Sequence, residues 1–329
     1  MPEIIGRNIE IGVGVEKVRG TAQLTAEKWI KKITANIIEK SENSIDASSH
    51  NVLEDSDGRR ITKKWIEGEL EGNVHADSIG YLLYNLYGSV VSSNVAGSVY
   101  SHVFNILQSI THPTLSLFAK DGSVQQSVFN NGMISTLELS ATVDDYVKFT
   151  SNFMAKEAAA NSDTPSYDTE YDFIGRDITL KIADTEAGLA AADAVCIKEF
   201  GITFDTGLIS DHCLGSYTPD DIYNAKMSIE GTITKNLIDE TFKDLNLADT
   251  DKYMEITIEG AADIGSGNNP SITILLNKVR VMNWERSGDN DSLVTENIEF
   301  KAFYNETDSK SSQITLQNLT TEYDTPVSD

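Results

Sequence analysis

Long stretches of this chain alternate apolar and polar residues, and this period-two pattern constrains the fold more than any other feature. In MISTLELSATVDDYVKFTSNFMAK (133–156), Leu137 and Leu139 share one face of a strand while Glu138 lies on the other. A polar hinge at 143–145 separates this part from a second alternating part. Alternation rich in Ile, Val, Thr and Phe is typical of strands with one buried face. We therefore predict a pair of strands here.

Similar patterns predict further strands at 109–123, 177–184, 272–284 and 294–307. Helical spacing is scarcer. It occurs in ADSIGYLLYNLYG (76–88), which ends in a glycine suited to a helix C-terminus, and in KNLIDETFKDLNL (235–247). The sequence therefore predicts a mainly β fold with two short helices.

One segment occurs twice, as WIEGELEGN at 65–73 and as SIEGTITKN at 228–236, an offset of 228 − 65 = 163 residues. Each copy leads into one of the two helical segments, and a pair of strands closes each half. This shared order predicts a duplicated fold. It also decides the nature of segment 30–40, whose apolar residues fit helical spacing, because the matched segment around Ile202 and Phe204 alternates. We predict a strand there.

The repeat suggests a division of the chain into five segments. We expect two similar β units, each with a short flanking helix, joined by a polar linker that is rich in small residues. The expected segments are an N-terminal arm (1–24), a first unit (25–155), a linker with one strand (156–194), a second unit (195–306) and a C-terminal tail segment (307–329).

The charge of the chain excludes several kinds of partner. Lys and Arg number 26 and Asp and Glu number 51, which gives a net charge of −25. Such a surface repels nucleic acid phosphates and anionic membranes. Two cysteines are too few for a disulfide scaffold and favour a reducing compartment. We find no signal peptide pattern at the N-terminus and no apolar run of the ~20 residues that a membrane helix needs.

The glycine-rich stretch IGVGVEKVRGTA (11–22) does not fit a nucleotide site. It lacks the third glycine of G-x-G-x-x-G, and Gly20 is followed by Thr21 rather than Lys. The five histidines show no metal-ligand spacing, and the acidic clusters lack the remaining features of a calcium-binding EF-hand loop. We therefore expect no catalytic residue, metal or cofactor, and we predict that the chain is not an enzyme.

The same stretch resembles the opening of bacteriophage tail tube proteins, the major tail proteins of long-tailed phages, in which a G-x-E-x-x-x-G-T-A-like segment occurs. The resemblance continues in order along nearly the whole chain, through the short helix, the central strand pair, a later Glu-Gly strand and the last strand. Ala155 stands where the family has a glycine. The positions that match are Gly14, Glu16, Gly20, Thr21, Ala22, Leu86, Gly88, Gly132, Leu137, Leu139, Phe153, Glu230, Gly231 and the segment 297–306.

The resemblance implies a β-sandwich or barrel with a short flanking helix, whose subunits join edge to edge so that their sheets form one inner barrel. It implies rings that stack into a hollow tube in the virion, assembled in the host cytoplasm. Viral DNA passes through the lumen without specific binding, after the tape measure protein has filled it. Tail terminator and distal tail or baseplate proteins are further implied partners. The resemblance also implies six-fold rings with one tube unit per subunit. Because two units lie in this chain, we predict a trimeric, pseudo-hexameric ring, with a hexamer as the alternative.

Two sets of residues follow as candidates. An acidic lumen lets DNA slide without sticking, and the acids of the predicted strand pairs are candidates to line it: Glu138, Asp144, Asp145, Glu285 and Glu299. The N-terminal stretch and the polar loops before the repeated strands are candidate assembly contacts: Gly14, Glu16, Arg19, Gly20, Asp55, Asp57, Arg59, Tyr217 and Asp220. Two alternatives stay open: the chain is another tail or baseplate subunit of related fold, or it is a soluble carbohydrate-binding β-sandwich.

Overall fold

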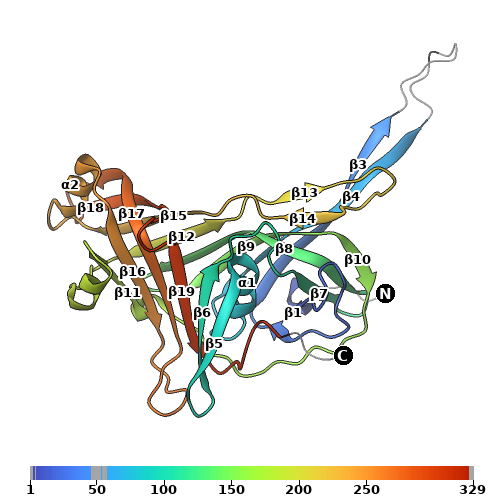
Figure 1. The fold of residues 1–329 in the computed structure, drawn as a ribbon, viewed down its shortest axis with the longest axis horizontal. Coiled ribbons are helices and arrows are strands. Elements are labelled where there is room, and N and C mark those ends of the chain that lie inside the picture. The colour runs from blue at the N-terminus through green and yellow to red at the C-terminus, as the bar shows by residue number, and fades with distance from the viewer. Residues whose placement is uncertain (1–2, 4, 46–52, 54–57, 326–329) are drawn as a thin grey trace.

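The computed structural model describes residues 3, 5–45, 53 and 58–325, and the mainly β fold predicted from the sequence is confirmed (Figure 1). Three short 3-10 turns, η1 (Gly6–Asn8), η2 (Gly175–Asp177) and η3 (Ala187–Ala191), accompany the strands and helices. The first half of the chain forms β1 (Ile9–Val15), β2 (Lys28–Ile30), β3 (Ile33–Ile45), β4 (Arg59–Asn73), α1 (Ile79–Tyr87), β5 (Gly88–Ala96), β6 (Val99–Ile106), β7 (Leu115–Asp121), β8 (Gln125–Thr142), β9 (Lys148–Ala155) and β10 (Glu157–Ala160). The second half forms β11 (Ile178–Ala183), β12 (Glu199–Asp205), β13 (Ile209–Asp211), β14 (Asp221–Tyr223), β15 (Ser228–Asn236), α2 (Thr241–Ala248), β16 (Lys252–Glu259), β17 (Ser271–Ser287), β18 (Thr295–Ala302) and β19 (Ser312–Asn318).

Eight strands form one antiparallel sheet that runs through both halves of the molecule, and we call it the long sheet. Its order is β3–β4–β9–β8–β12–β15–β18–β17. The first four strands come from the first half of the chain and the last four from the second half. The long sheet therefore has β3 at one edge and the second part of β17 at the other.

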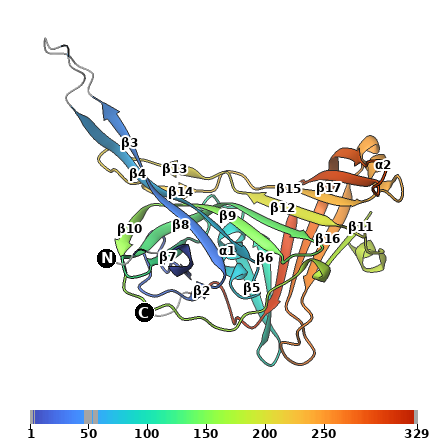
Figure 2. The same ribbon diagram turned by 180° about the vertical axis from the view of Figure 1, so that it is seen from behind.

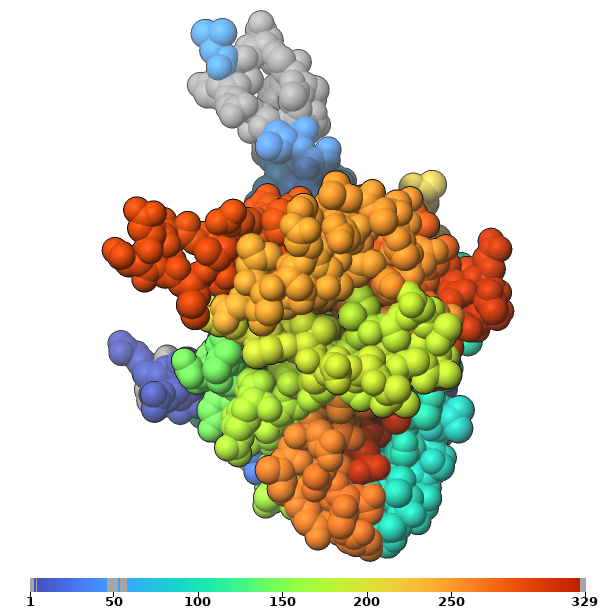
Figure 3. All heavy atoms as spheres, turned by 90° about the vertical axis from the view of Figure 1, so that its left-hand side faces the viewer, coloured from blue at the N-terminus to red at the C-terminus, as the bar shows by residue number. Residues whose placement is uncertain are grey.

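A second layer covers one face of the long sheet. β8 and β17 are long enough to continue into this layer, where their first parts pair with β7 and β10 and with β16 and β19. β1 and β2 extend the layer on one side, and the β5–β6 hairpin joins it through β19. Figure 3 views the end of the molecule that carries α2, where the β5–β6 hairpin lies next to the β16–β17 connection.

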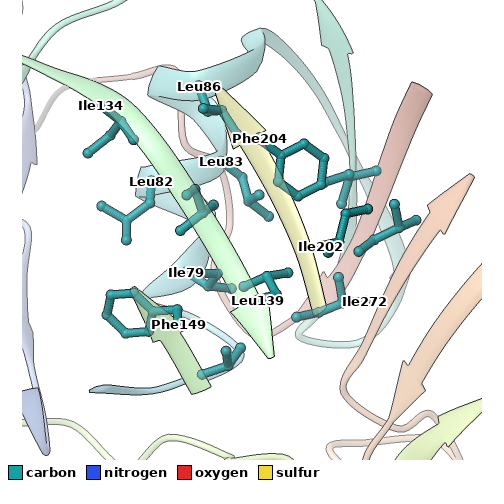
Figure 4. Close-up of a cluster of buried hydrophobic side chains, with 14 of the residues drawn as sticks. Ile79, Leu82, Leu83, Leu86, Ile134, Leu139, Phe149, Ile202, Phe204 and Ile272 are labelled. Carbon is teal, nitrogen blue, oxygen red and sulfur yellow. The ribbon is translucent and has the colours of Figure 1, made fainter. Parts of the chain in front are cut away.

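The core lies between the long sheet and the elements that cover it. Helix α1 presents apolar side chains at intervals of three and four residues, so they form one stripe. Figure 4 shows this stripe facing β8, β9 and β12. The helix ends at Gly88, whose φ of 83° is a left-handed conformation that suits glycine. The side chains labelled there are buried: Ile79, Leu82, Leu83, Leu86, Ile134, Leu139, Phe149, Ile202, Phe204 and Ile272.

The two halves repeat the same strand pairings, which confirms the duplicated fold. In the first half, the pairs are β1–β7, β7–β8, β8–β9, β9–β4, β4–β3 and β10–β8. In the second half, the corresponding pairs are β11–β16, β16–β17, β17–β18, β18–β15, β15–β12 and β19–β17. The β5–β6 hairpin and β2 have no counterpart among the strands of residues 156–325, the described part of the second half.

Residue contacts repeat as well. Gly68 pairs with Phe153 across β4 and β9, and Gly231 pairs with Phe300 across β15 and β18. In both places the phenylalanine ring lies over the glycine, and an added Cβ would come within 2.4 Å and 2.3 Å of the ring, respectively. The sequence repeat therefore marks a glycine that leaves room for an aromatic ring.

Most predicted elements agree with the structure, but some boundaries differ. The strand predicted at 109–123 forms only over β7, Leu115–Asp121. The hinge at 143–145 separates β8 from β9, and segment 30–40 is largely strand β3, as predicted. The second helix was predicted from residue 235, but α2 begins at Thr241. The Asp239 carboxylate accepts a hydrogen bond from the Thr241 backbone N–H at 2.9 Å, which favours a turn there, and Ile238 is exposed.

The strand pairing also draws on segments that we placed outside the two units. β1, from segment 1–24, pairs with β7 and is largely buried. β11, from segment 156–194, pairs with β16, and β19, from segment 307–329, pairs with β17 and β6. Each unit therefore takes strands from its flanking segments, while the division of the chain into domains stays a prediction.

Candidate functional site

The two halves meet where β12 pairs with β8, and we call this pairing the internal joint. Seven residue pairs form it, from Glu199 opposite Thr142 to Asp205 opposite Thr136. On the covered face its side chains are apolar and buried: Phe200, Ile202, Phe204, Leu137, Leu139 and Ala141. Phe204 also packs edge-on against Tyr87, with 6.0 Å between the ring centres. The internal joint is therefore continuous with the core.

The duplication leaves two strand edges without the partner that their counterparts have. In the first half, β3 corresponds to β12, but its outer edge has no hydrogen-bonded strand among the described residues. In the second half, residues 283–287 of β17 correspond to the part of β8 that pairs with β12. In the part of the chain that the structure describes, these residues pair with β18 alone. The long sheet thus ends in two open edges.

The face of the long sheet opposite α1, which we call the open face, is strongly acidic. Over residues 33–42 of β3, 63–73 of β4 and the other six strands, alternation places ten carboxylates, four lysines and one arginine on it. The bases are Lys40, Lys63, Lys148, Lys301 and Arg280, and the acids are Glu42, Glu67, Glu69, Glu71, Glu138, Glu199, Asp205, Glu230, Glu285 and Glu299.

Salt bridges occupy all of these bases. Lys40 lies 3.6 Å from Glu67, Lys63 lies 3.4 Å from Glu42, Lys148 lies 2.6 Å from Asp145 in the adjoining turn, and Lys301 lies 2.5 Å from Glu230. Arg280 pairs with Asp249 and Asp251 in the α2–β16 connection. The hydrogen bond from Lys301 holds the pKa of Glu230 below its usual value, and that from Lys148 does the same for Asp145. The other carboxylates outnumber these bases, so the open face carries net negative charge at neutral pH.

Three of the five candidate lumen acids lie together on the open face: Glu138, Glu285 and Glu299. Asp144 and Asp145 lie in the β8–β9 turn at the end of the strands. Glu138, Asp205, Glu230 and Glu299 line one shallow groove. Its counterpart in the first half runs between β3, β4, β8 and β9.

Sequence reasoning missed the other acids of the open face. Those of β4 could have been found, because Glu67, Glu69 and Glu71 alternate with Ile66 and Leu70. The acids of β12 and β15 needed the pairing of β12 with β8, which is not local in the sequence.

Glu16 and Gly20, proposed as assembly contacts, have partners inside the chain. The buried Glu16 carboxylate accepts hydrogen bonds from the backbone N–H groups of Gly20 and Asn131 and from the hydroxyls of Thr114 and Ser116. Burial raises the pKa of Glu16 above its usual value, although these hydrogen bonds act against the rise. Gly20 has a φ of 75°, a left-handed conformation. The hydrogen bonds fold residues 16–20 back onto the body of the protein.

Arg19 ties this turn to the β13–β14 ribbon. Its Nε donates to both carboxylate oxygens of Asp221, at 2.9 and 3.0 Å, and its terminal nitrogens donate to the backbone carbonyls of His112 and Ile222. Burial acts to raise the pKa of Asp221, but the bonds from Arg19 and Asn131 outweigh it and hold the pKa below its usual value. These contacts within the chain hold the Arg19 side chain in place and join the turn to the ribbon.

The remaining assembly candidates fall into two groups. Gly14 lies within the buried strand β1, opposite Ser116. Arg59 starts β4, while Tyr217 and Asp220 lie between β13 and β14, on a ribbon that runs beside the β3–β4 hairpin (Figures 1 and 2). The Tyr217 carbonyl accepts a hydrogen bond from the Lys64 N–H at 2.7 Å, which joins ribbon to hairpin. Asp55 and Asp57 lie outside the described residues.

Neither a metal cluster nor a membrane-spanning helix is found in the described part of the chain. No group of three or more His, Cys, Asp or Glu side chains there could hold a metal ion. Among residues 5–45 and 58–325 the α-helices are α1 and α2, and neither is long and apolar enough to cross a membrane. Cys196 and Cys213 are free and exposed.

Comparison with protein-family models relates the chain to a known family. No curated protein matches the chain. A family model described as phage tail tube protein matches residues 6–302, which is nearly the whole chain. This match covers the first repeated unit, most of the second, the internal joint and both open edges. The chain belongs to the phage tail tube protein family.

Proposed function

We propose that this protein builds the wall of a phage tail tube by closing into rings of three copies that stack end to end. Its role is structural rather than catalytic. Membership of the tail tube family supports a place in the virion. We propose that the chain assembles in the host cytoplasm around the tape measure protein. Tail terminator and distal tail or baseplate proteins would then contact the two ends of the finished tube.

The observation that carries the proposal is the pair of open edges on a duplicated sheet. Within one chain, two equivalent four-stranded halves already join through β12 and β8. If β3 of one copy pairs with β17 of the next in the same way, the long sheets continue around a ring. Closure of a sheet removes exposed edges, which are otherwise sites of aggregation.

We propose three copies because the resemblance implies rings of six units, and each copy contributes two quasi-equivalent halves. Eight strands per copy give twenty-four strands in all. At a spacing of ~4.8 Å and with a tilt of about 40°, the barrel backbone would be roughly 45–50 Å across. Barrels of about 16–18 strands already leave an aqueous channel, so this one has room for a lumen.

The open face suits the inner wall of that barrel. Its excess of carboxylates repels the phosphates of DNA, so that viral DNA passes through without specific binding. Glu138, Glu285 and Glu299 would then line the lumen, and Asp144 and Asp145 would lie near its rim. The β3–β4 hairpin and the β13–β14 ribbon, with Arg59, Tyr217 and Asp220, are the proposed contacts with the adjacent ring.

Cryo-electron microscopy of the assembled protein tests the proposal directly. We expect hollow tubes whose rings contain three copies with pseudo-six-fold symmetry and whose inner wall is the open face. Six copies per ring would contradict the trimer. A chain that forms no rings or tubes at high concentration, with or without the tape measure protein, would contradict the proposed function itself.

A further inference from the structure

We infer that the joint between neighbouring copies repeats the register of the internal joint but is held by charged side chains where the internal joint is apolar. This inference rests on the proposed ring and specifies which residues meet within it. It uses the duplication inside one chain as a template for contacts between chains.

The equivalence of β3 and β12 follows from the repeated glycines. Ile37 lies opposite Gly68 on β4, and Ile202 lies opposite Gly231 on β15. Ile37 therefore corresponds to Ile202. By the same alignment, Glu39 corresponds to Phe204.

The equivalence of β8 and β17 follows from the repeated phenylalanines. Ile134 lies opposite Phe153, and Val281 lies opposite Phe300. In each strand the register then shifts by one residue at the next position, which is Ser135 in β8 and Met282 in β17. Because the irregularity recurs at the same place, the two strands align without a gap at an offset of 281 − 134 = 147.

This alignment carries the pairs of the internal joint over to the open edges. Leu137 and Leu139 correspond to Trp284 and Arg286. The pair Ile202–Leu139 then becomes Ile37 opposite Arg286 of the next copy, and Phe204–Leu137 becomes Glu39 opposite Trp284. On the open face, the corresponding pairs are Ile38–Glu285, Lys40–Asn283 and Asn36–Ser287.

The transferred pairs place opposite charges near each other on both faces. Glu39 and Arg286 become diagonal neighbours on the covered face, and Lys40 and Glu285 become diagonal neighbours on the open face. Diagonal positions in an antiparallel pair lie ~7–8 Å apart, which long side chains can span. Glu39 and Arg286 are exposed in the single chain, whereas their counterparts Phe204 and Leu139 are buried.

The two joints therefore differ in a way that suits their tasks. The internal joint must form whenever the chain folds, and apolar side chains provide this. The edges between copies must stay soluble before assembly, and charged residues on edge strands discourage unspecific pairing. The charges of the two edges are complementary, so the preferred partner of each edge is the other edge of a second copy.

Disulfide trapping tests the register. In a chain with Cys196→Ser and Cys213→Ser, we would introduce Asn36→Cys with Ser287→Cys, and for comparison Ile38→Cys with Ser287→Cys. Residues directly opposite lie within the Cα separation that a disulfide accepts, whereas the second pair, displaced by two residues, lies beyond it. We expect assembled rings of the first variant to give covalent dimers and trimers on non-reducing gels, at least ~5-fold more than the second.

The outcomes separate this inference from the ring proposal. Rings that crosslink mainly through the second pair, or through neither pair, would overturn the inferred register and leave the ring proposal standing. If the serine-substituted parent forms no rings although the unmodified chain does, the same pairs would be tested with the native cysteines retained. If the unmodified chain forms none, the ring proposal fails, and this inference with it.

Charge reversal tests the side-chain pair. We expect Glu39→Arg or Arg286→Glu alone to raise the protein concentration needed for ring formation about 10-fold, because like charges then face each other. The double variant should return to within about 3-fold of the unmodified chain. Glu186→Arg, at an exposed acid beside η3, is the matched control and should change little. A double variant that assembles no better than the single ones, while its monomer unfolds normally, would overturn the pairing of Glu39 with Arg286.

Discussion

At the scale of single residues, the hydrogen bonds of Asp221 make stability depend on pH. Arg19 and Asn131 hold the pKa of this carboxyl below its ordinary value of 3.8. A lowered pKa in the folded state contributes stability above the ordinary value, and this contribution disappears as pH falls through the folded value. We expect Asp221→Asn to lower the free energy of unfolding by about 1–2 kcal/mol at pH 7.

The difference between Asp221→Asn and the unmodified chain should shrink as pH falls below the ordinary value. Urea unfolding at a series of pH values measures it. Asp220→Asn, at an exposed neighbour, serves as the control and should show little difference at any pH. A difference for Asp221→Asn that is the same at pH 7 and at pH 3 would contradict the role of the charged form.

The repeated glycines give a second prediction at this scale. A Cβ at Gly231 would lie 2.3 Å from Cζ of Phe300 and 2.6 Å from the Gly201 carbonyl. Gly231→Ala should therefore lower the free energy of unfolding by about 2–3 kcal/mol, because buried neighbours must move. Gly201→Ala meets only the Thr232 hydroxyl, at 3.2 Å, and should cost less in a thermal unfolding assay. Equal costs would contradict the steric explanation.

At the scale of elements, local patterns predicted the strands that have one buried face. β8, β9, β17 and β18 alternate clearly, and the sequence alone predicted them. The β5–β6 hairpin was missed, because β5 is mostly exposed and its polar and small residues weaken the alternation. β13 and β14 have three residues each, which is too short for any periodicity.

The candidate site was less predictable than the fold, for a physical reason. Alternation tells which residues share a face of one strand, so Glu138 and Glu299 were found. It does not tell which strands lie side by side, so neither the pairing of β12 with β8 nor the open edges of β3 and β17 could be derived. The similarity between Gly68 and Gly231 indicated the duplication, but their partners Phe153 and Phe300 became apparent only in the structure.

The two units differ in their cores, and this gives a prediction at the same scale. Near α2, the Lys235 ammonium donates to the Glu296 carboxylate at 2.6 Å, and both side chains are buried. The Trp284 indole donates to the other oxygen of Glu296, also at 2.6 Å. Breaking such a pair leaves a buried charge without a partner, so Glu296→Gln should lower the free energy of unfolding by about 3–5 kcal/mol.

Replacing both partners should cost much less. We expect Lys235→Met with Glu296→Leu to recover most of the lost stability, because no charge then stays buried. Glu230→Gln, which breaks the exposed pair with Lys301, is the control and should cost less than about 1 kcal/mol. Chemical denaturation of the four proteins compares these values. A double variant as unstable as Glu296→Gln would show that the pair contributes more than charge compensation.

At the scale of the whole molecule, one face of the long sheet carries part of the acidity of the chain. The sequence has 51 acidic residues, and the long sheet gathers ten of their carboxylates on its open face. The opposite face is mostly apolar, and α1 and the second layer cover most of it. In the proposed ring, the charged face surrounds the path of the DNA, and the covered face supports the wall.

The last prediction concerns this charged face in complete virions. Glu71→Lys, Glu138→Lys and Glu299→Lys together exchange three exposed acids of the open face, away from the edges of the long sheet, for bases. Tubes should still form, but DNA release after triggering should be at least ~3-fold slower, because lysines attract the phosphates that carboxylates repel. The delay should decrease at high salt.

The matched control carries the same change of charge elsewhere. Glu186→Lys, Asp193→Lys and Glu306→Lys alter three exposed acids, two that flank η3 and one in the β18–β19 connection. Fluorescence from a dye that binds released DNA measures both variants. If the open face lines the lumen, only the first variant slows release, since only its new charges meet the passing DNA. Normal release by virions that contain the open-face variant would place the open face elsewhere, and equal delays in both variants would assign the effect to total charge.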